Sequence, residues 1–464
     1  MPFDNVQFDP FAQKMQAADL PPLFIETFYH YYNQLVAGQT GLIPEADIEP
    51  VTAVPDAEQL PGEMTAAGEA ALGETAVIKL NGGLGTSMGL QQAKSLLPVK
   101  NGLSFLDIIA RQALQTGVPL ILMNSFVTEA DSLAALANYP DLQKAVPLSF
   151  VQHKEPKVSR ETMQPVAWPD NPELEWCPPG HGDIYTALVT SGTLDALLEN
   201  GYRYAFVSNA DNLGAVMDTA ILGYFVHNDF PFMMEVADRT EMDKKGGHLA
   251  RRPDGQLILR ESAQCPEADV AKFQDVGRHK YFNTNNLWLN LEALRSVLAA
   301  NDNRLPLPMI RNQKTVDPRD PESTAVYQLE TAMGSAIGVF PGAQALRVPR
   351  NRFAPVKTTD DLFLVRSNAY TLTDDFRVLP DPARVLPLPV VELDRDFYKF
   401  VPDLEHRFPA GPPALDQCTA FSVAGDIAFG QDVVCVQEVH LQNKNEQPLT
   451  IPDGQVLSGT QVWR

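Results

Sequence analysis

The sequence predicts an α/β fold in which a mostly parallel sheet carries helices on both faces. From Ala76 onward, short apolar runs alternate with segments whose apolar residues recur at helical spacing. Parallel neighbours need a crossover connection, so strands and helices in alternation predict a sheet that is covered on both sides. Ligands of such sheets bind beyond the carboxyl ends of the strands. The glycine-rich and polar motifs of this chain fall at those ends.

The elements of this region can be placed one by one. Strands are expected over the short apolar runs 76–80, 118–123, 148–152 and 204–208. Helices are expected between them, at 106–114, 128–138 and 184–199, and Gly117 and Gly201 are suited to end two of these helices. A glycine-rich segment between Asp238 and Pro266 contains the turn Pro253-Asp254-Gly255, which predicts an inserted hairpin.

The two ends of the chain have a different character. Residues 1–70 are expected to form a helical arm, with its apolar run at 23–32, and then a Pro- and Ala-rich linker from Pro44 to Gly68. The main α/β domain is expected at 71–373. From 374 to 464 the chain is Pro-rich and helix-poor, and glycine-punctuated apolar alternation after Phe421 predicts a small β-helix or β-roll of short coils.

Bulk composition excludes several functions. The 464 residues carry a formal net charge of -22, so the broad basic face that nucleic-acid binding requires is not expected. The four cysteines are far apart and lack metal-site or disulfide-scaffold spacing. The start of the chain does not resemble a signal peptide, and no run of eighteen apolar residues occurs. We therefore expect a cytoplasmic protein with no membrane partner and no nucleic-acid partner.

The strongest local signal is the glycine cluster Leu80–Gly89, which follows a predicted strand and precedes Lys94. Glycine lets several backbone N–H groups converge on phosphate oxygens, although a lone glycine run is as often only a tight turn. Neither common phosphate loop fits. The P-loop needs glycine directly before the lysine, where Ala93 stands, and the dinucleotide fingerprint needs glycine at the position of Met88.

This cluster resembles the nucleotide-binding loop of the eukaryotic-type UDP-glucose pyrophosphorylases, which are UTP:glucose-1-phosphate uridylyltransferases. Further stretches resemble the same family in the same order, over about residues 76–370 and more faintly beyond. Two departures, Ala93 and Ala210, replace a common proline and a common serine of the family. The motifs that carry the resemblance are Leu80–Gly89 with Lys94–Ser95, Pro178–Tyr185, Asn209–Ala215, Phe282–Trp288, Gln328–Ala332 and Val348–Thr359.

The resemblance implies a fold and a reaction. The fold is a nucleotide-diphospho-sugar transferase domain, a Rossmann-like mixed sheet with helices on both faces, followed by a C-terminal left-handed β-helix. The reaction joins UTP to glucose 1-phosphate and gives UDP-glucose and pyrophosphate, reversibly and with Mg²⁺. A phosphate oxygen of the sugar phosphate attacks the α-phosphorus of UTP in line, so no protein nucleophile is needed.

Site residues are implied by matching positions. UTP would be held by Leu80, Asn81, Gly82, Gly83, Lys94, Gln152, Gly180, Asp211 and Lys357. The sugar phosphate would be held by Gly82, Gly83, His181, Asn209, Ala210, Asp211, Asn285 and Glu330. Lys94, Lys357 and His181 would be catalytic, and Asp211 would hold Mg²⁺, which prefers carboxylate and phosphate oxygens. The amide of Gln152 can both donate to and accept from a uracil edge.

Other interpretations of these residues remain open. If the family resemblance is set aside, each residue has a simpler interpretation. His181 would be a structural histidine, and the run Asn283–Asn286 would be a turn. Lys357 would be a solvated surface lysine, and Asp211 would cap a helix. An enzyme of broader sugar preference, such as an N-acetylhexosamine or general UDP-sugar pyrophosphorylase, is a second hypothesis, and a catalytically silent sugar-nucleotide binder is a third. The edges of the C-terminal coils could pair between subunits, which would give a homo-oligomer.

Overall fold

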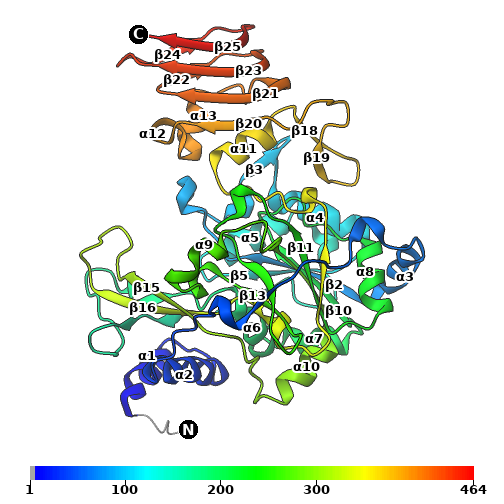
Figure 1. Cartoon of the computed structure of the whole chain (residues 1–464), viewed down its shortest axis with the longest axis vertical. Helices are drawn as coiled ribbons and strands as arrows, with labels where there is room; N and C mark the ends of the chain where they lie inside the picture. Colours follow the sequence, from blue (N-terminus) through cyan, green and yellow to red (C-terminus); the bar gives the residue numbers. More distant parts are fainter. Residues whose placement is uncertain (1–5) are drawn as a thin grey trace.

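The computed structural model describes residues 6–464, in three regions along the long axis of the molecule (Figure 1). Helices near the N-terminus lie at one end, a large sheet with helices around it forms the middle, and strands stack one above another at the C-terminal end. Residues 1–5 of the expected N-terminal arm lie outside the described residues. The two ends of the described chain therefore lie far apart.

The middle region is a mixed α/β sheet, which confirms the predicted fold class. Its parallel part has the order β10-β2-β5-β6, and β14 runs antiparallel between β10 and β11. The expected hairpin is present as β12 and β13, with Gly255 at φ +92° in its turn. The strands are β2 (Thr75–Asn81), β5 (Leu120–Asn124), β6 (Ser149–Val151), β10 (Tyr204–Asn209), β11 (Phe232–Asp238), β12 (His248–Arg251), β13 (Leu257–Arg260), β14 (Tyr281–Asn290) and β17 (Gln344–Arg347).

Helices cover both faces of this sheet. Successive residues of a strand point to opposite faces, and Ile78 packs in a core with α6, α7 and α10 whereas Val77 packs in another with α4 and α8. The helix expected over 184–199 is two helices, because the chain breaks at Gly192 with φ +73°. The helices are α4 (Phe105–Thr116), α5 (Glu129–Leu136), α6 (Ile184–Thr190), α7 (Thr193–Glu199), α8 (Thr219–His227), α9 (Val270–Phe273) and α10 (Leu291–Ala299).

The N-terminal part begins with α1 (Asp9–Ala17) and α2 (Pro22–Val36), so the apolar run at 23–32 is helical as expected. The interval from Pro44 to Gly68 differs from the linker that its composition suggested. It carries β1 (Glu49–Pro50), which pairs with β12, and most of α3 (Glu63–Ala71), which packs against α8. A Cβ at Gly68 would lie 1.8 Å from a backbone oxygen of α8. Small residues therefore serve close helix packing here.

The C-terminal region stacks parallel strands. β20, β21, β23 and β25 are neighbours in one sheet, and β22 and β24 form a second. Their apolar core also takes Phe363 from α11, which stacks on Phe421 at 5.2 Å. The elements are α11 (Thr359–Arg366), β18 (Tyr370–Leu372), β19 (Val378–Pro380), β20 (Val390–Leu393), α12 (Arg395–Tyr398), α13 (Val401–Arg407), β21 (Ala414–Ala424), β22 (Ile427–Phe429), β23 (Val434–Asn443), β24 (Leu449–Ile451) and β25 (Val456–Trp463).

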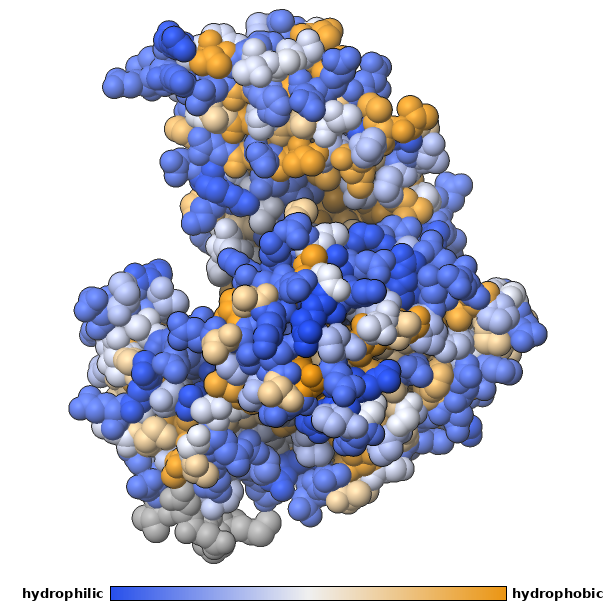
Figure 2. Space-filling model, viewed as in Figure 1, coloured by the Kyte–Doolittle hydropathy of each residue, from blue (hydrophilic) through white to orange (hydrophobic). Residues whose placement is uncertain are grey.

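The surface is predominantly polar on the face shown in Figure 2, and its outline is indented between the C-terminal strands and the rest of the molecule. Across residues 6–464, none of the helices combines the length and apolar character that crossing a bilayer requires. An arm beside the indentation contains β15 (Ile310–Thr315) and β16 (Ala325–Glu330). The arm matters for the site because β16 ends at a polar cavity.

Candidate active site

Two adjoining cavities lie at the carboxyl ends of the parallel strands. The first has a volume of about 350 Å³ and the second about 510 Å³, and both lie within the range of small-molecule sites. His181 and Asn209 line both cavities. The structure brings every candidate site residue to one or the other. The first takes Leu80, Asn81, Gly82, Gly83, Lys94, Gln152, Gly180, His181, Asn209, Ala210 and Asp211, and the second adds Asn285, Glu330 and Lys357.

The glycine loop leaves β2 and forms one wall of the first cavity. Its shape is held by backbone bonds, because the N–H of Lys94 donates to the carbonyl of Gly83 at 3.0 Å. Gly85 has φ +67°, a conformation that suits glycine. A Cβ at Gly82 would lie 2.8 Å from Nε2 of Gln152, whereas Gly83 faces open space. The loop therefore presents backbone to the cavity at close range.

Lys94 and Asp211 form an ion pair at the floor of the first cavity. Nζ of Lys94 donates to Oδ2 of Asp211 at 2.6 Å, and the two side chains are 14% and 25% exposed. Lys94 follows the glycine loop and Asp211 follows the end of β10, so the pair connects the ends of two neighbouring parallel strands. A cation and a carboxylate thus stand together beside the glycine loop.

A buried network sets Asp211 relative to Lys357. The N–H of Val356 donates to the carbonyl of Asp211 at 3.2 Å, and Nδ2 of Asn212 donates to the carbonyl of Arg352 at 3.1 Å. The guanidinium of Arg352 forms two hydrogen bonds to Glu235, at 2.7 and 2.8 Å, with both side chains buried. The segment that bears Lys357 is therefore fixed onto the end of β10.

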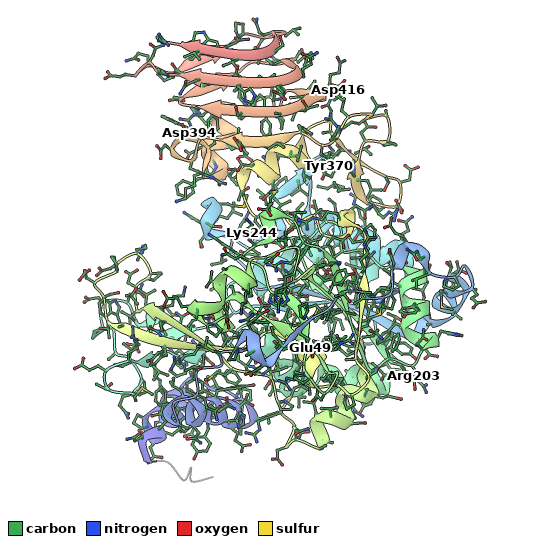
Figure 3. The ribbon with its side chains drawn as sticks, in the orientation of Figure 1. Glu49, Arg203, Lys244, Tyr370, Asp394 and Asp416 are labelled. Atoms are coloured by element: carbon green, nitrogen blue, oxygen red, sulfur yellow. The ribbon has the colours of Figure 1, made fainter. Side chains whose placement is uncertain are left out.

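Lys357 itself is exposed and lines the second cavity. Its Nζ lies 5.7 Å from the ring centroid of Phe353, and it has no ion-pair partner among residues 6–464. Lys245, in the loop after β11, lines the same cavity and is likewise unpaired within that part of the chain. In Figure 3 its neighbour Lys244 lies on the side of the large sheet that is nearer the C-terminal strands.

His181 stands where the two cavities meet. Its Nδ1 accepts the N–H of Met333 at 2.9 Å, so a neutral ring carries its proton on Nε2. Burial lowers the pKa of His181 from 6.5 to about 4. At neutral pH, His181 is a neutral hydrogen-bond donor at the cavity rather than a cation.

The second cavity is lined by groups suited to hydroxyls. Asn285 has φ +60° within β14, and Nδ2 of Asn283 donates to its Oδ1 at 2.7 Å, so this run is an irregular strand instead of a turn. Burial raises the pKa of Glu330, at the end of β16. Burial also raises the pKa of Glu261 to about 7. This carboxyl, like Lys245, was not among the expected site residues.

The described residues offer Mg²⁺ a partial site. Asp211 supplies a carboxylate at the first cavity, and Mg²⁺ commonly takes one or two protein carboxylates together with substrate phosphates. No group of three or more His, Cys, Asp or Glu side chains that could hold a metal occurs within residues 6–464. The donor set fits an ion that arrives with a nucleotide better than an ion held by protein alone.

Fold and site together define a protein that binds small molecules, with cavities at the end of a mixed α/β sheet that suit phosphate-bearing ligands. A family model described as UTP--glucose-1-phosphate uridylyltransferase matches residues 25–436. The chain is 42% identical to the UTP--glucose-1-phosphate uridylyltransferase of Solanum tuberosum over 399 residues, which are 84% of this chain and 81% of that protein. The Saccharomyces cerevisiae protein of the same name is 39% identical over 398 residues, 84% of this chain and 78% of that one. The chain belongs to the UTP--glucose-1-phosphate uridylyltransferase family.

Solved structures agree with this assignment over the full length. A point mutant of UDP-glucose pyrophosphorylase from Leishmania major superposes with a TM-score of 0.93 at 44% identity, covering 99% of each chain. A second mutant of the same enzyme, in complex with UDP-glucose, has a TM-score of 0.89 at 43% identity and covers 99% of each chain. The similarity therefore extends through the C-terminal strands.

Proposed function

We propose that this chain transfers the uridylyl group between UTP and glucose 1-phosphate, giving UDP-glucose and pyrophosphate reversibly. The observation that carries the proposal is the pair of adjoining cavities, which gathers the glycine loop, a lysine–aspartate pair and two exposed lysines at the end of the sheet. Membership of the family supports the choice of substrates. UTP would occupy the first cavity and the sugar phosphate the second.

The reaction needs positioning and charge, not a protein nucleophile. A phosphate oxygen of glucose 1-phosphate bonds to the α-phosphorus of UTP while the bond from that phosphorus to the bridging oxygen breaks, and pyrophosphate leaves with the electron pair. Backbone N–H groups at Gly82 and Gly83 would donate to phosphate oxygens, and Lys94 and Lys357 would offset the charge of the meeting phosphates.

Neutral His181 would contribute a hydrogen bond instead of a charge. Its Nε2–H would donate to a phosphate oxygen of the sugar phosphate, while Nδ1 stays engaged by Met333. Gln152 and Gly180 would read the uracil edge, and Asn285 and Glu330 the sugar hydroxyls. Leu80, Asn81, Asn209 and Ala210 would complete the walls.

Asp211 would hold Mg²⁺ when nucleotide binds, and the ion would supply electrostatic stabilisation of the phosphate charges. Lys94, whose Nζ pairs with that carboxylate at 2.6 Å, would lie beside the same phosphates. The proposal predicts that EDTA abolishes turnover and that Mg²⁺ restores it. Turnover that EDTA leaves unchanged would refute the metal requirement.

One assay tests the activity and its alternatives. Labelled pyrophosphate should exchange into UTP when UDP-glucose and Mg²⁺ are present, and less when UDP-galactose or UDP-N-acetylglucosamine replaces UDP-glucose. Equal exchange with all three sugar nucleotides would favour an enzyme of broad sugar preference. No exchange by folded protein that binds UDP-glucose would favour a silent binder.

Four further expectations also form part of the proposal. The parallel stacking of β20, β21, β23 and β25 supports a C-terminal left-handed β-helix and a division at 1–70, 71–373 and 374–464. The edge strand β25 exposes Val456 and Val462, which supports pairing between subunits. Gel filtration with light scattering tests that pairing, and a monomer would refute it. Cytoplasmic location stays a prediction that microscopy of the tagged protein tests.

A further inference from the structure

A buried bridge lies behind the first cavity and joins the two segments proposed to recognise uracil. His153 follows Gln152 at the end of β6, and Asp183 follows Gly180 by three residues and directly precedes α6. His153 is 8% exposed and Asp183 is 4% exposed. Neither lines the two cavities of the site, so neither is placed to touch a substrate.

In this bridge, the carboxylate of Asp183 accepts two hydrogen bonds from His153. The backbone N–H of His153 donates to Oδ2 of Asp183 at 2.7 Å, and the ring Nδ1 lies 2.8 Å from Oδ1. An ionised carboxylate only accepts, so the ring carries a proton on Nδ1 and donates it to Asp183. The bridge thereby fixes both the backbone and the side chain of His153 relative to the turn that contains Gly180.

Two further contacts hold the ring of His153 in place. Its Nε2 lies 3.0 Å from Oγ1 of Thr190, the last residue of α6, so the ring contacts side chains from both ends of this helix. On one face it stacks on Phe24 of α2, with ring centroids 4.2 Å apart and planes at 12°. The end of β6 is therefore clamped between an N-terminal helix and α6.

We propose that His153 and Asp183 are positioning residues that set the distance between Gln152 and Gly180, and through it the selectivity for uracil. The inference rests on the proposed use of UTP. Two segments that bind the edge of one base can distinguish it from another base only when the distance between them is fixed. Segments that can move relative to each other can adjust to a different base. The bridge fixes that spacing with buried, charge-assisted hydrogen bonds.

Two substitutions of His153 separate the bridge from the remaining contacts. In His153→Asn, the side-chain amide nitrogen lies near the position of Nδ1 and can donate to Asp183. In His153→Gln, it lies near the position of Nε2 and reaches toward Thr190 instead. Both variants lose the stacking on Phe24 equally. They differ mainly in the bridge, so each is the matched control of the other.

The measurement is the ratio of kcat/KM for UTP to that for CTP, with glucose 1-phosphate as the second substrate. His153→Gln should raise KM for UTP and lower the ratio by about tenfold, the loss expected for one buried hydrogen bond to a charged group. His153→Asn should stay within about threefold of wild type. KM for glucose 1-phosphate and kcat should change little in both. Thr190→Val should leave the ratio unchanged, because the bridge remains.

Equal losses in the two His153 variants, or an unchanged ratio in His153→Gln, would overturn the inference. If His153→Gln does not fold, Asp183→Ser is measured in its place, since the shorter serine side chain cannot reach the ring of His153. An unchanged UTP-to-CTP ratio in Asp183→Ser would also overturn the inference. The wild-type reaction with UTP and glucose 1-phosphate serves as reference. Its absence would refute the proposed function, whereas its presence with unaltered selectivity in the variants would refute only the role of the bridge.

Discussion

Lys357→Ala separates a catalytic role from a structural one, because the structure gives this side chain very little to stabilise. Lys357 is exposed, and its Nζ contacts the ring of Phe353 at 5.7 Å without an ion pair among residues 6–464. An exposed cation–π contact contributes about 0.5–1 kcal/mol. Loss of a preorganised charge that stabilises a transition state costs about 10²–10³-fold in rate, or about 2.7–4 kcal/mol. We therefore expect a catalytic loss several times larger than any loss of folding free energy.

Two measurements test this expectation, kcat for UDP-glucose formation and the urea midpoint of unfolding. Lys399→Ala is the matched control, since Lys399 is also exposed and its Nζ lies 5.2 Å from the ring of Phe400, outside both cavities. The control should lose a similar small stability and keep its turnover. Near wild-type kcat in Lys357→Ala, or a fall in stability large enough to account for the lost activity, would refute the reasoning.

Three further predictions concern glycine and histidine. Gly82→Ala should raise KM for UTP about tenfold with little loss of stability, because the new Cβ displaces only the flexible amide of Gln152, 2.8 Å away; unchanged UTP kinetics would contradict it. Burial lowers the pKa of His181 to about 4, so the ring stays neutral down to about that pH. The pH profile of kcat/KM should therefore show no decline near pH 6.5 in the wild type that is absent from His181→Gln. Such a decline would show that the ring titrates in the working range. Gly223→Ala should lower the unfolding free energy by about 1–3 kcal/mol, because its Cβ would lie 1.7 Å from a backbone oxygen of α3; in Gly73→Ala, where nothing lies within 4 Å, the urea midpoint should not fall.

The sheet could be predicted from the sequence because each buried parallel strand is a short apolar run followed by a turn signal. The prediction was less accurate where small residues have two uses. Gly192 lies within an apolar-periodic stretch and breaks a helix there, and Gly68 lies in a stretch of linker-like composition and makes a close helix contact instead. Composition does not distinguish a glycine that ends a helix from one that allows two helices to touch.

Only those site residues that lie within short sequence motifs could be predicted from the sequence. Each motif near a strand end was identified, and the fold brings these ends together. Lys245 and Glu261 were missed because they come from the loop and hairpin after β11, where no local pattern marks them. The pair of Glu235 and Arg352 was missed as well, since 117 residues separate its partners. Periodicity carries no information about which distant charges meet.

The strong negative charge of the chain is compatible with binding anions because the relevant field is local. At physiological ionic strength, charges more than about 8 Å apart are largely screened, so a net charge of -22 spread over the surface matters less than the cations at the cavity. Lys94, which lines the first cavity, is already offset by Asp211. Lys245 and Lys357 are left as the unpaired positive charges of the second cavity, within the part of the chain that the structure describes. If phosphates bind here as proposed, the first attraction would therefore come from the exposed Lys245 and Lys357, because the charge of Lys94 is already paired with Asp211.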